Sequence, residues 1–177
     1  MKQLVLTLTV FLLMQMGPTN AMAFKEYPAG EEKVVNSMKI AAVYLKPINM
    51  EHTGGAMGLP ASQADVHLEA DIHATTGNLN GFGAGEWIPY LTINYKLKNK
   101  DTGQEQSGSF MPMIAKDGPH YGSNIKMFGP GNYILTYTIE SPAKQGLARH
   151  TDAETGVGAW FQPFSVEYTF IYVPIGK

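Results

Sequence analysis

The chain contains no cysteine among its 177 residues. Disulfide bonds, thiolate metal sites, iron–sulfur clusters and cysteine nucleophiles are therefore all excluded. A soft metal ligand, if the protein has one, must be a methionine thioether, and the sequence holds ten methionines.

A strong excess of one charge is also missing. The formal net charge is −2 at pH 7, from 13 basic and 15 acidic residues. A protein that binds nucleic acid or an anionic membrane surface usually carries a basic excess, so the composition favours neither partner.

Only one long apolar run occurs, and it lies at the N-terminus. Lys2 precedes an apolar stretch from Leu4 to Met14, and Ala21-Met22-Ala23 supplies small residues around a cleavage position. These features are typical of a secretory signal peptide, and the run is too short for a stable membrane anchor. We expect residues 1–23 to be removed, which leaves residues 24–177 as a single domain without stable membrane insertion.

Long helical patterns are nearly absent, whereas alternation of apolar and polar residues recurs along the chain. The alternating segments are 38–45, 65–73, 87–97, 133–139 and 164–172. Turn signals at 99–103 and 129–132 separate some of them, and Pro89 marks an edge or a bulge near the start of the 87–97 strand. Many alternating strands joined by turns rich in glycine and proline predict an all-β, antiparallel β-sandwich.

The common catalytic motifs are missing as well. The chain has no Gly-x-Ser-x-Gly elbow, no His-Glu-x-x-His helix and no P-loop. The segment 81–85 is glycine-rich, but no helical pattern follows it, so it is typical of a turn and not of a phosphate-binding loop. The sequence therefore predicts a protein that is not an enzyme.

The 65–73 segment carries the clearest chemical signal. Its even-numbered residues are apolar, whereas its odd-numbered residues are all potential metal ligands: Asp65, His67, Glu69, Asp71 and His73. Because alternate side chains of a strand point to opposite faces, one face is expected to pack on the core and the other to bind a metal. Neighbours on one face lie ~6.7 Å apart, so His67 and Glu69 can reach a common point, whereas His67 and His73, ~20 Å apart, cannot share one ion.

A second group of donors lies between residues 111 and 122. The donors are Met111, Met113, Asp117 and His120. The two methionines share a face if this segment is a strand, and we expect Gly118-Pro119 to turn the chain so that His120 returns toward Met113. Packing in the core is the alternative role for each methionine.

His150 lies in a polar loop before the last predicted strand, and alone it is typical of a solvated histidine. If the fold brings it to His67, His120 and Met113, the site contains three imidazoles and one thioether. Imidazole suits copper, zinc and iron(II), thioether favours Cu(I), and a nearby carboxylate favours harder ions. The residue types alone therefore leave both copper and iron open.

Four segments together resemble the periplasmic iron-transport proteins of Gram-negative bacteria, a family that includes a treponemal metal-binding lipoprotein. The segments are 64–74 (ADVHLEADIHA), 81–90 (GFGAGEWIPY), 110–126 (FMPMIAKDGPHYGSNIK) and 150–158 (HTDAETGVG). The resemblance extends over essentially the whole mature chain, from about Gly30 to Tyr172.

The resemblance implies an immunoglobulin-like β-sandwich that forms a homodimer and takes part in ferrous-iron uptake with an inner-membrane permease. It implies a copper site made of His67, Met113, His120 and His150, with Glu69 beside it and Asp117 close by. Further candidates, for supporting contacts or for a second metal, are Met111, Asp71 and His73. Because the lipoprotein cysteine is missing, we expect the protein to be free in the periplasm.

Three other functions compete with iron import. A periplasmic copper chaperone or copper-tolerance protein is the first, although the His-x-Met pair of one common chaperone type is missing here. A copper enzyme acting on iron or on oxygen species would need an open metal position and redox cycling. An adhesion module would leave the histidines incidental, which the alternating row of ligands disfavours.

Overall fold

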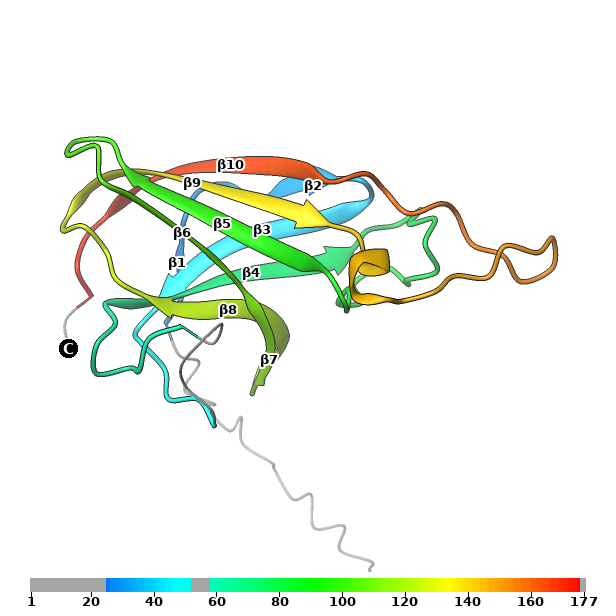
Figure 1. Cartoon of the computed structure of the whole chain (residues 1–177), viewed down its shortest axis with the longest axis horizontal. Helices are drawn as coiled ribbons and strands as arrows, with labels where there is room; N and C mark the ends of the chain where they lie inside the picture. The colour runs from blue at the N-terminus through cyan, green and yellow to red at the C-terminus, as the bar shows by residue number, and fades with distance from the viewer. Residues whose placement is uncertain (1–24, 52–57, 176–177) are drawn as a thin grey trace, which may run out of the picture.

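The computed structural model describes residues 25–51 and 58–175, so the expected signal peptide, residues 1–23, lies outside the described ranges, as does His52. Two antiparallel sheets pack face to face (Figure 1). This arrangement confirms the β-sandwich expected from the alternating segments. Within the described ranges, no helix has the length and apolar character needed to cross a membrane.

The larger sheet carries the residues of the candidate site. Its strands follow the order β1-β3-β4-β8-β7, and β2 also pairs with β3. Their bounds are β1 Tyr27–Pro28, β2 Lys33–Val35, β3 Met38–Leu45, β4 Val66–Ala74, β7 Met111–Ala115 and β8 Gly118–Ile125.

The smaller sheet covers one face of the larger one. Its strands follow the order β10-β9-β5-β6, and a short 3₁₀ helix, η2, follows β9. The bounds are β5 Thr92–Asn99, β6 Glu105–Ser109, β9 Gly131–Glu140, η2 Pro142–Gln145 and β10 Phe164–Tyr172. The chain passes from the smaller sheet to the larger one at Phe110, which is buried between β6 and β7.

The predicted strand at 87–97 begins later than its alternation indicates. Trp87 makes only an isolated bridge to His73, and regular pairing starts at Thr92. Tyr90 has a φ of 60°, a left-handed conformation that a strand cannot contain. Pro89 therefore lies before the strand and not at a bulge within it.

Four tyrosines are fully buried in the core, and each hydroxyl donates a hydrogen bond to a backbone carbonyl. Tyr137, on the smaller sheet, donates to the Glu69 carbonyl at 2.9 Å, which ties β4 to the facing sheet. Tyr133 donates to the Gly129 carbonyl at 2.7 Å, near the start of β9. A tyrosine that returns to the backbone a few residues upstream is a hallmark of immunoglobulin-like sandwiches.

Candidate metal centre

The predicted ligand row lies on β4, and part of this row is buried. His67 is 0% exposed and Glu69 is 4% exposed, whereas Asp71 and His73 are half-buried. Asp65 is used differently, because its carboxylate accepts hydrogen bonds from Lys126 Nζ at 3.0 Å and from the Met127 backbone at 2.9 Å. The ligand-bearing face of β4 is therefore buried around His67 and Glu69 and more open to solvent around Asp71 and His73.

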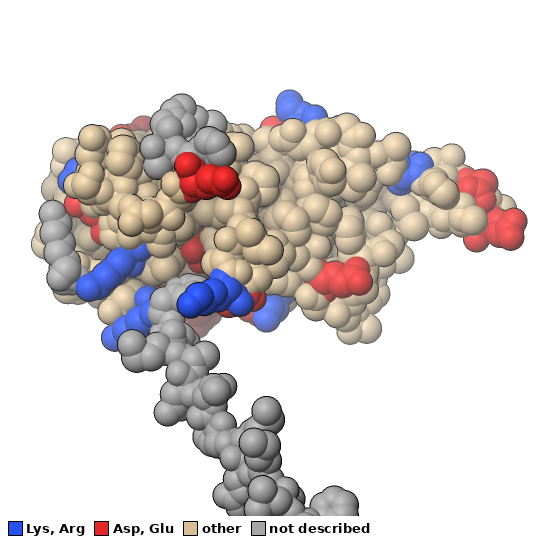
Figure 2. All heavy atoms as spheres, turned by 90° about the horizontal axis from the view of Figure 1, so that it is seen from below, with Lys and Arg blue, Asp and Glu red and all other residues tan. Residues whose placement is uncertain are grey.

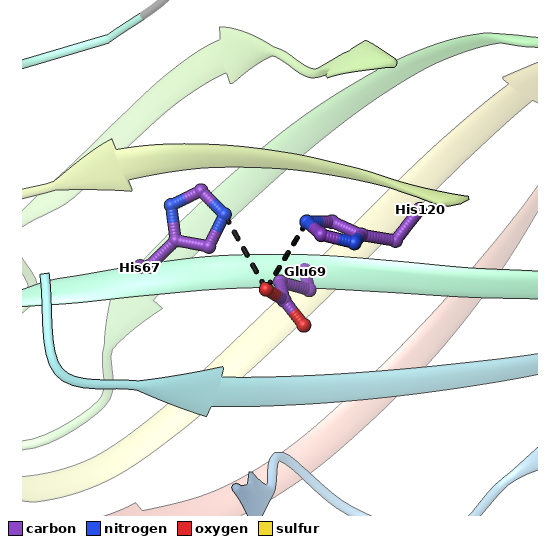
Figure 3. A group of neighbouring side chains, drawn as sticks. All are labelled: His67, Glu69 and His120. Atoms are coloured by element: carbon purple, nitrogen blue, oxygen red, sulfur yellow. Dashed lines mark ion pairs between the residues drawn. The ribbon is translucent and has the colours of Figure 1, made fainter. Parts of the chain in front are cut away.

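The pairing of β4 with β8 brings His120 to this site. His67 is opposite Asn124 and Glu69 is opposite Gly122, so His120, two residues before Gly122, projects from the same face. Glu69 Oε1 lies 3.4 Å from His67 Nε2 and 3.2 Å from His120 Nε2 (Figure 3). The ligand atoms of these three residues all lie within 4.8 Å of one another. The expectation that His67 and Glu69 reach a common point is confirmed.

Asn124 fixes the protonation pattern of His67. Asn124 Nδ2 donates to the carbonyls of Ile48 at 2.8 Å and Leu59 at 3.0 Å, so its Oδ1 is the atom that faces His67 Nδ1, 2.9 Å away. An amide oxygen only accepts hydrogen bonds, which places the hydrogen of the neutral ring on Nδ1. His67 Nε2 therefore presents a lone pair to Glu69.

His120 presents its Nε2 in the same way. Burial lowers the pKa of His120, while a hydrogen bond with the Gly118 backbone and the negative charge of Asp117 act in the opposite direction. Nε2 has no hydrogen-bond partner, which leaves Nδ1 as the nitrogen available to the Gly118 backbone. Two imidazole lone pairs thus face one carboxylate oxygen.

Gly122 leaves the space that the His67 ring occupies. A Cβ atom at position 122 would lie 2.6 Å from His67 Nε2 and 3.1 Å from Cε1. Any side chain at this position would therefore collide with the ring and displace it from its place beside Glu69. This role could not be predicted from the sequence, because a glycine in a strand can equally mark a bulge or a bend.

The electrostatics of the buried group favour neutral side chains. Burial lowers the pKa of His67 to about 4 from its ordinary 6.5. Burial, together with the charges of Asp71, Glu26 and Asp117, raises the pKa of Glu69 to about 8 from 4.5. At pH 7 the metal-free group therefore holds a protonated Glu69 between two neutral imidazoles.

This arrangement fits a metal ion. A protonated Glu69 has one hydrogen to donate, so it cannot satisfy both buried Nε2 atoms, and each of them lacks a hydrogen-bond partner. Buried polar atoms without partners are costly. A cation would accept both imidazole lone pairs and would favour the ionised carboxylate. Imidazole and carboxylate donors suit Cu(II), Zn(II) and Fe(II).

The two methionines lie on β7, next to β8. Met113 is paired with His120 and Met111 is paired with Gly122, so both thioether side chains belong to the face that carries the site. Both residues are half-buried. The return of His120 toward Met113 is confirmed, although the turn lies at Lys116-Asp117 and not at Gly118-Pro119, which begins β8.

The remaining acidic candidates line a neighbouring cavity. This cavity of about 280 Å³ adjoins His120, and its lining includes Asp71, His73 and Asp117 together with Glu26 and Glu32. Burial and the charges of Glu26 and Asp117 raise the pKa of Asp71 to about 6. Asp71 and Asp117 therefore influence Glu69 through their charge, from a space beside the group of three ligands.

His150 lies apart from this group within the chain. It is exposed in the segment between η2 and β10, where its Nδ1 lies 2.7 Å from Thr155 Oγ1. This segment projects from the body of the sandwich, at the right of Figures 1 and 2, whereas β4, β7 and β8 lie within the body. A single chain brings together His67, Glu69 and His120, with Met113 on the neighbouring strand, and leaves His150 outside.

Two relatives are similar to this chain over most of its length, and a family model described as Fe2+ transport protein matches residues 23–174. A UPF0423 protein of Brucella abortus is 47% identical over 180 residues, which cover 100% of this chain and 98% of the relative. The 34 kDa membrane antigen of Treponema pallidum is 37% identical over 152 residues, which cover 84% of this chain and 74% of the antigen.

Two solved structures with bound copper have the same fold. A copper-bound glutamate-to-glutamine variant of FetP from uropathogenic Escherichia coli matches with a TM-score of 0.84 and 66% identity, over 87% of this chain and 96% of that chain. Copper-reconstituted P19 from Campylobacter jejuni matches with a TM-score of 0.83 and 57% identity, over 86% of this chain and 99% of that chain. A further FetP structure comes from protein expressed in the periplasm of Escherichia coli.

Proposed function

The chain belongs to the family of Fe2+ transport proteins, and we propose that it is a periplasmic copper-binding protein that takes part in ferrous-iron uptake. The observation that carries this proposal is the buried group of His67, Glu69 and His120, in which two imidazole nitrogens without partners face one carboxylate oxygen. Copper-bound structures of similar proteins support copper as the metal.

The proposed copper ligands are His67, His120 and Met113 from one copy of the chain and His150 from a second copy. Met113 is on the strand next to His120 and belongs to the same face. His150 is exposed on a projecting segment, so it is suited to reach the site of another molecule. A homodimer of this kind contains two copper sites, each completed by the partner subunit.

Glu69 gives the site its affinity for harder ions. A carboxylate oxygen suits iron and manganese better than a thioether does. Half-buried Asp71 and exposed Asp117 line the adjoining cavity, and the charges of both raise the pKa of Glu69. We propose that iron binds transiently near Glu69 and passes to an inner-membrane permease, while copper is held by the imidazoles and the thioether.

Competitive copper titration of the mature chain, residues 24–177, tests the metal site. Wild-type protein should bind one Cu(II) per chain, and His67→Ala and His120→Ala should each weaken binding at least ~100-fold. His73→Ala is the matched control, because His73 is on the same face of β4 but outside the buried group. Tight binding that survives both His67→Ala and His120→Ala would refute the site.

Growth of a deletion strain tests the iron role. Loss of the gene should slow growth in iron-limited medium, and added iron should restore it.

The copper-bound relatives also favour a second function, in copper tolerance. A deletion strain that is sensitive to copper but grows normally without iron supplementation would establish that second function instead.

A further inference from the structure

The segment between η2 and β10 holds a chain of hydrogen bonds that ends at His150. The Thr155 hydroxyl donates to Asp152 Oδ2 at 2.8 Å, and Thr155 Oγ1 lies 2.7 Å from His150 Nδ1. Because the hydroxyl hydrogen is used by Asp152, Thr155 Oγ1 can only accept from the ring. The neutral His150 ring therefore carries its hydrogen on Nδ1 and its lone pair on Nε2.

We call the hydrogen-bonded chain Asp152–Thr155–His150 the relay. The backbone around the relay is itself hydrogen-bonded. Asp152 Oδ1 accepts from the backbone N–H groups of Glu154 at 3.0 Å and Thr155 at 2.9 Å, and the Val157 N–H donates to the His150 carbonyl at 3.1 Å. Farther along, Asn80 Nδ2 donates to the Gly158 carbonyl at 3.1 Å. The relay is therefore held in place by the backbone on which it is built.

All three histidines of the proposed site share this pattern. Asn124 Oδ1 accepts from His67 Nδ1, and the Gly118 backbone is the partner of His120. For the two buried rings, this leaves Nε2 pointing at Glu69. His150 is exposed, so water could form a hydrogen bond with either of its ring nitrogens. The hydrogen bond between Nδ1 and Thr155 is therefore not needed to solvate the ring.

We infer that Thr155 and Asp152 are positioning residues that hold His150 with Nε2 free, ready to bind the metal of a second copy of the chain. The inference rests on the proposed function, in which His150 completes the partner subunit's site. A metal-ligating histidine needs its other ring nitrogen oriented by an acceptor, and loss of that acceptor typically costs 10–100-fold in affinity.

Three substitutions test the relay in the full mature chain. Thr155→Val removes the acceptor and keeps the shape of the side chain, whereas Thr155→Ser keeps the hydroxyl. Asp152→Asn keeps the Oδ1 that caps the turn and turns an amide donor toward Thr155. The Thr155 hydroxyl hydrogen is then free to donate to His150 Nδ1, and this bond favours the ring hydrogen on Nε2.

Nitrogen-15 NMR of the His150 ring in metal-free protein gives the first readout, and competitive Cu(II) titration gives the second. Wild type and Thr155→Ser should show the Nδ1–H form and agree in copper affinity within about threefold. Asp152→Asn should shift the ring toward the Nε2–H form, and Thr155→Val should lose the preference for Nδ1–H. Both should weaken copper binding by about 10–100-fold.

The outcomes separate this inference from the proposed function. If His150→Ala weakens copper binding but Thr155→Val and Asp152→Asn do not, the relay is not a positioning device and only the inference is overturned. A ring tautomer that is unchanged in both Asp152→Asn and Thr155→Val also overturns it. If His150→Ala leaves copper affinity unchanged, His150 is not a ligand, and the proposed ligand set is overturned together with the inference.

Discussion

Replacing Gly122 by alanine should remove most of the copper affinity and leave the sandwich folded. The added Cβ would lie 2.6 Å from His67 Nε2, whereas ordinary contacts begin near 3.4 Å, so the ring must move by about 0.8 Å, the difference between the two. The His67 ring cannot move freely, because its Nδ1 is hydrogen-bonded to Asn124 Oδ1. A ligand displaced by nearly 1 Å no longer fits the set. We expect a loss of about 100-fold, or ~2.7 kcal/mol.

The assay is competitive Cu(II) titration alongside urea denaturation, and Gly108→Ala is the matched control. Gly108 and Tyr95 both belong to the smaller sheet, whereas the metal site is on the larger one. A Cβ at position 108 would lie 2.7 Å from the ring of Tyr95. Each variant should lose about 1–3 kcal/mol of folding stability through overpacking, but only Gly122→Ala should lose copper. Unchanged copper affinity in a folded Gly122→Ala protein would refute the geometry of the site, as would equal copper losses in both variants.

Three further predictions follow from the same geometry. First, the metal-free chain should be less stable at pH 8 than at pH 6.5. The raised pKa of Glu69, about 8 against 4.5, means that the native state keeps a proton that the unfolded chain has lost, so this group reduces stability as pH rises, by up to ~1.4 kcal/mol per pH unit. His67, with its pKa lowered to about 4, acts in the opposite sense only below pH 6.5. Urea denaturation at the two pH values should show the drop in wild type and not in Glu69→Gln. Second, Met113→Leu should change folding stability by less than ~1.5 kcal/mol and selectively weaken Cu(I) binding; a large fall in melting temperature with unchanged Cu(I) affinity would make Met113 a packing residue. Third, light scattering on residues 24–177 at micromolar concentration should give about twice the monomer mass, and a monomer mass would contradict the proposed dimer.

Much of the sheet structure could be predicted from alternation alone. The segment 38–45 coincides with β3, and 133–139 and 164–172 fall within β9 and β10. The start of β5 could not be predicted, because the left-handed conformation of Tyr90 interrupts an alternation that otherwise extends back to Trp87. A pattern of apolar residues reports which side chains face the core, and it carries no information about a local break in the backbone.

The candidate site was only partly predictable for a related reason. His67 and Glu69 could be identified as potential ligands because the alternation that indicates them lies within a single strand, β4. The contribution of Asn124 and the space left by Gly122 depend on the register between β4 and β8, which are more than 40 residues apart in the chain. The position of His150 depends on the path of a projecting segment and, in our proposal, on a second subunit.

Subunit mixing is the most direct test of the central claim that each copper site combines His67, His120 and Met113 of one subunit with His150 of its partner. The His67→Ala and His150→Ala proteins, each of which binds copper weakly alone, are mixed after partial unfolding and refolded together. Each mixed dimer then contains one complete site, because the His150→Ala subunit supplies His67 and its partner supplies His150. We predict that tight Cu(II) binding returns at about one quarter of the wild-type stoichiometry, since half of randomly paired dimers are mixed and half of their sites are complete. If copper affinity stays low in the mixture although mixed dimers are present, His150 does not act across the dimer and the proposed site is wrong.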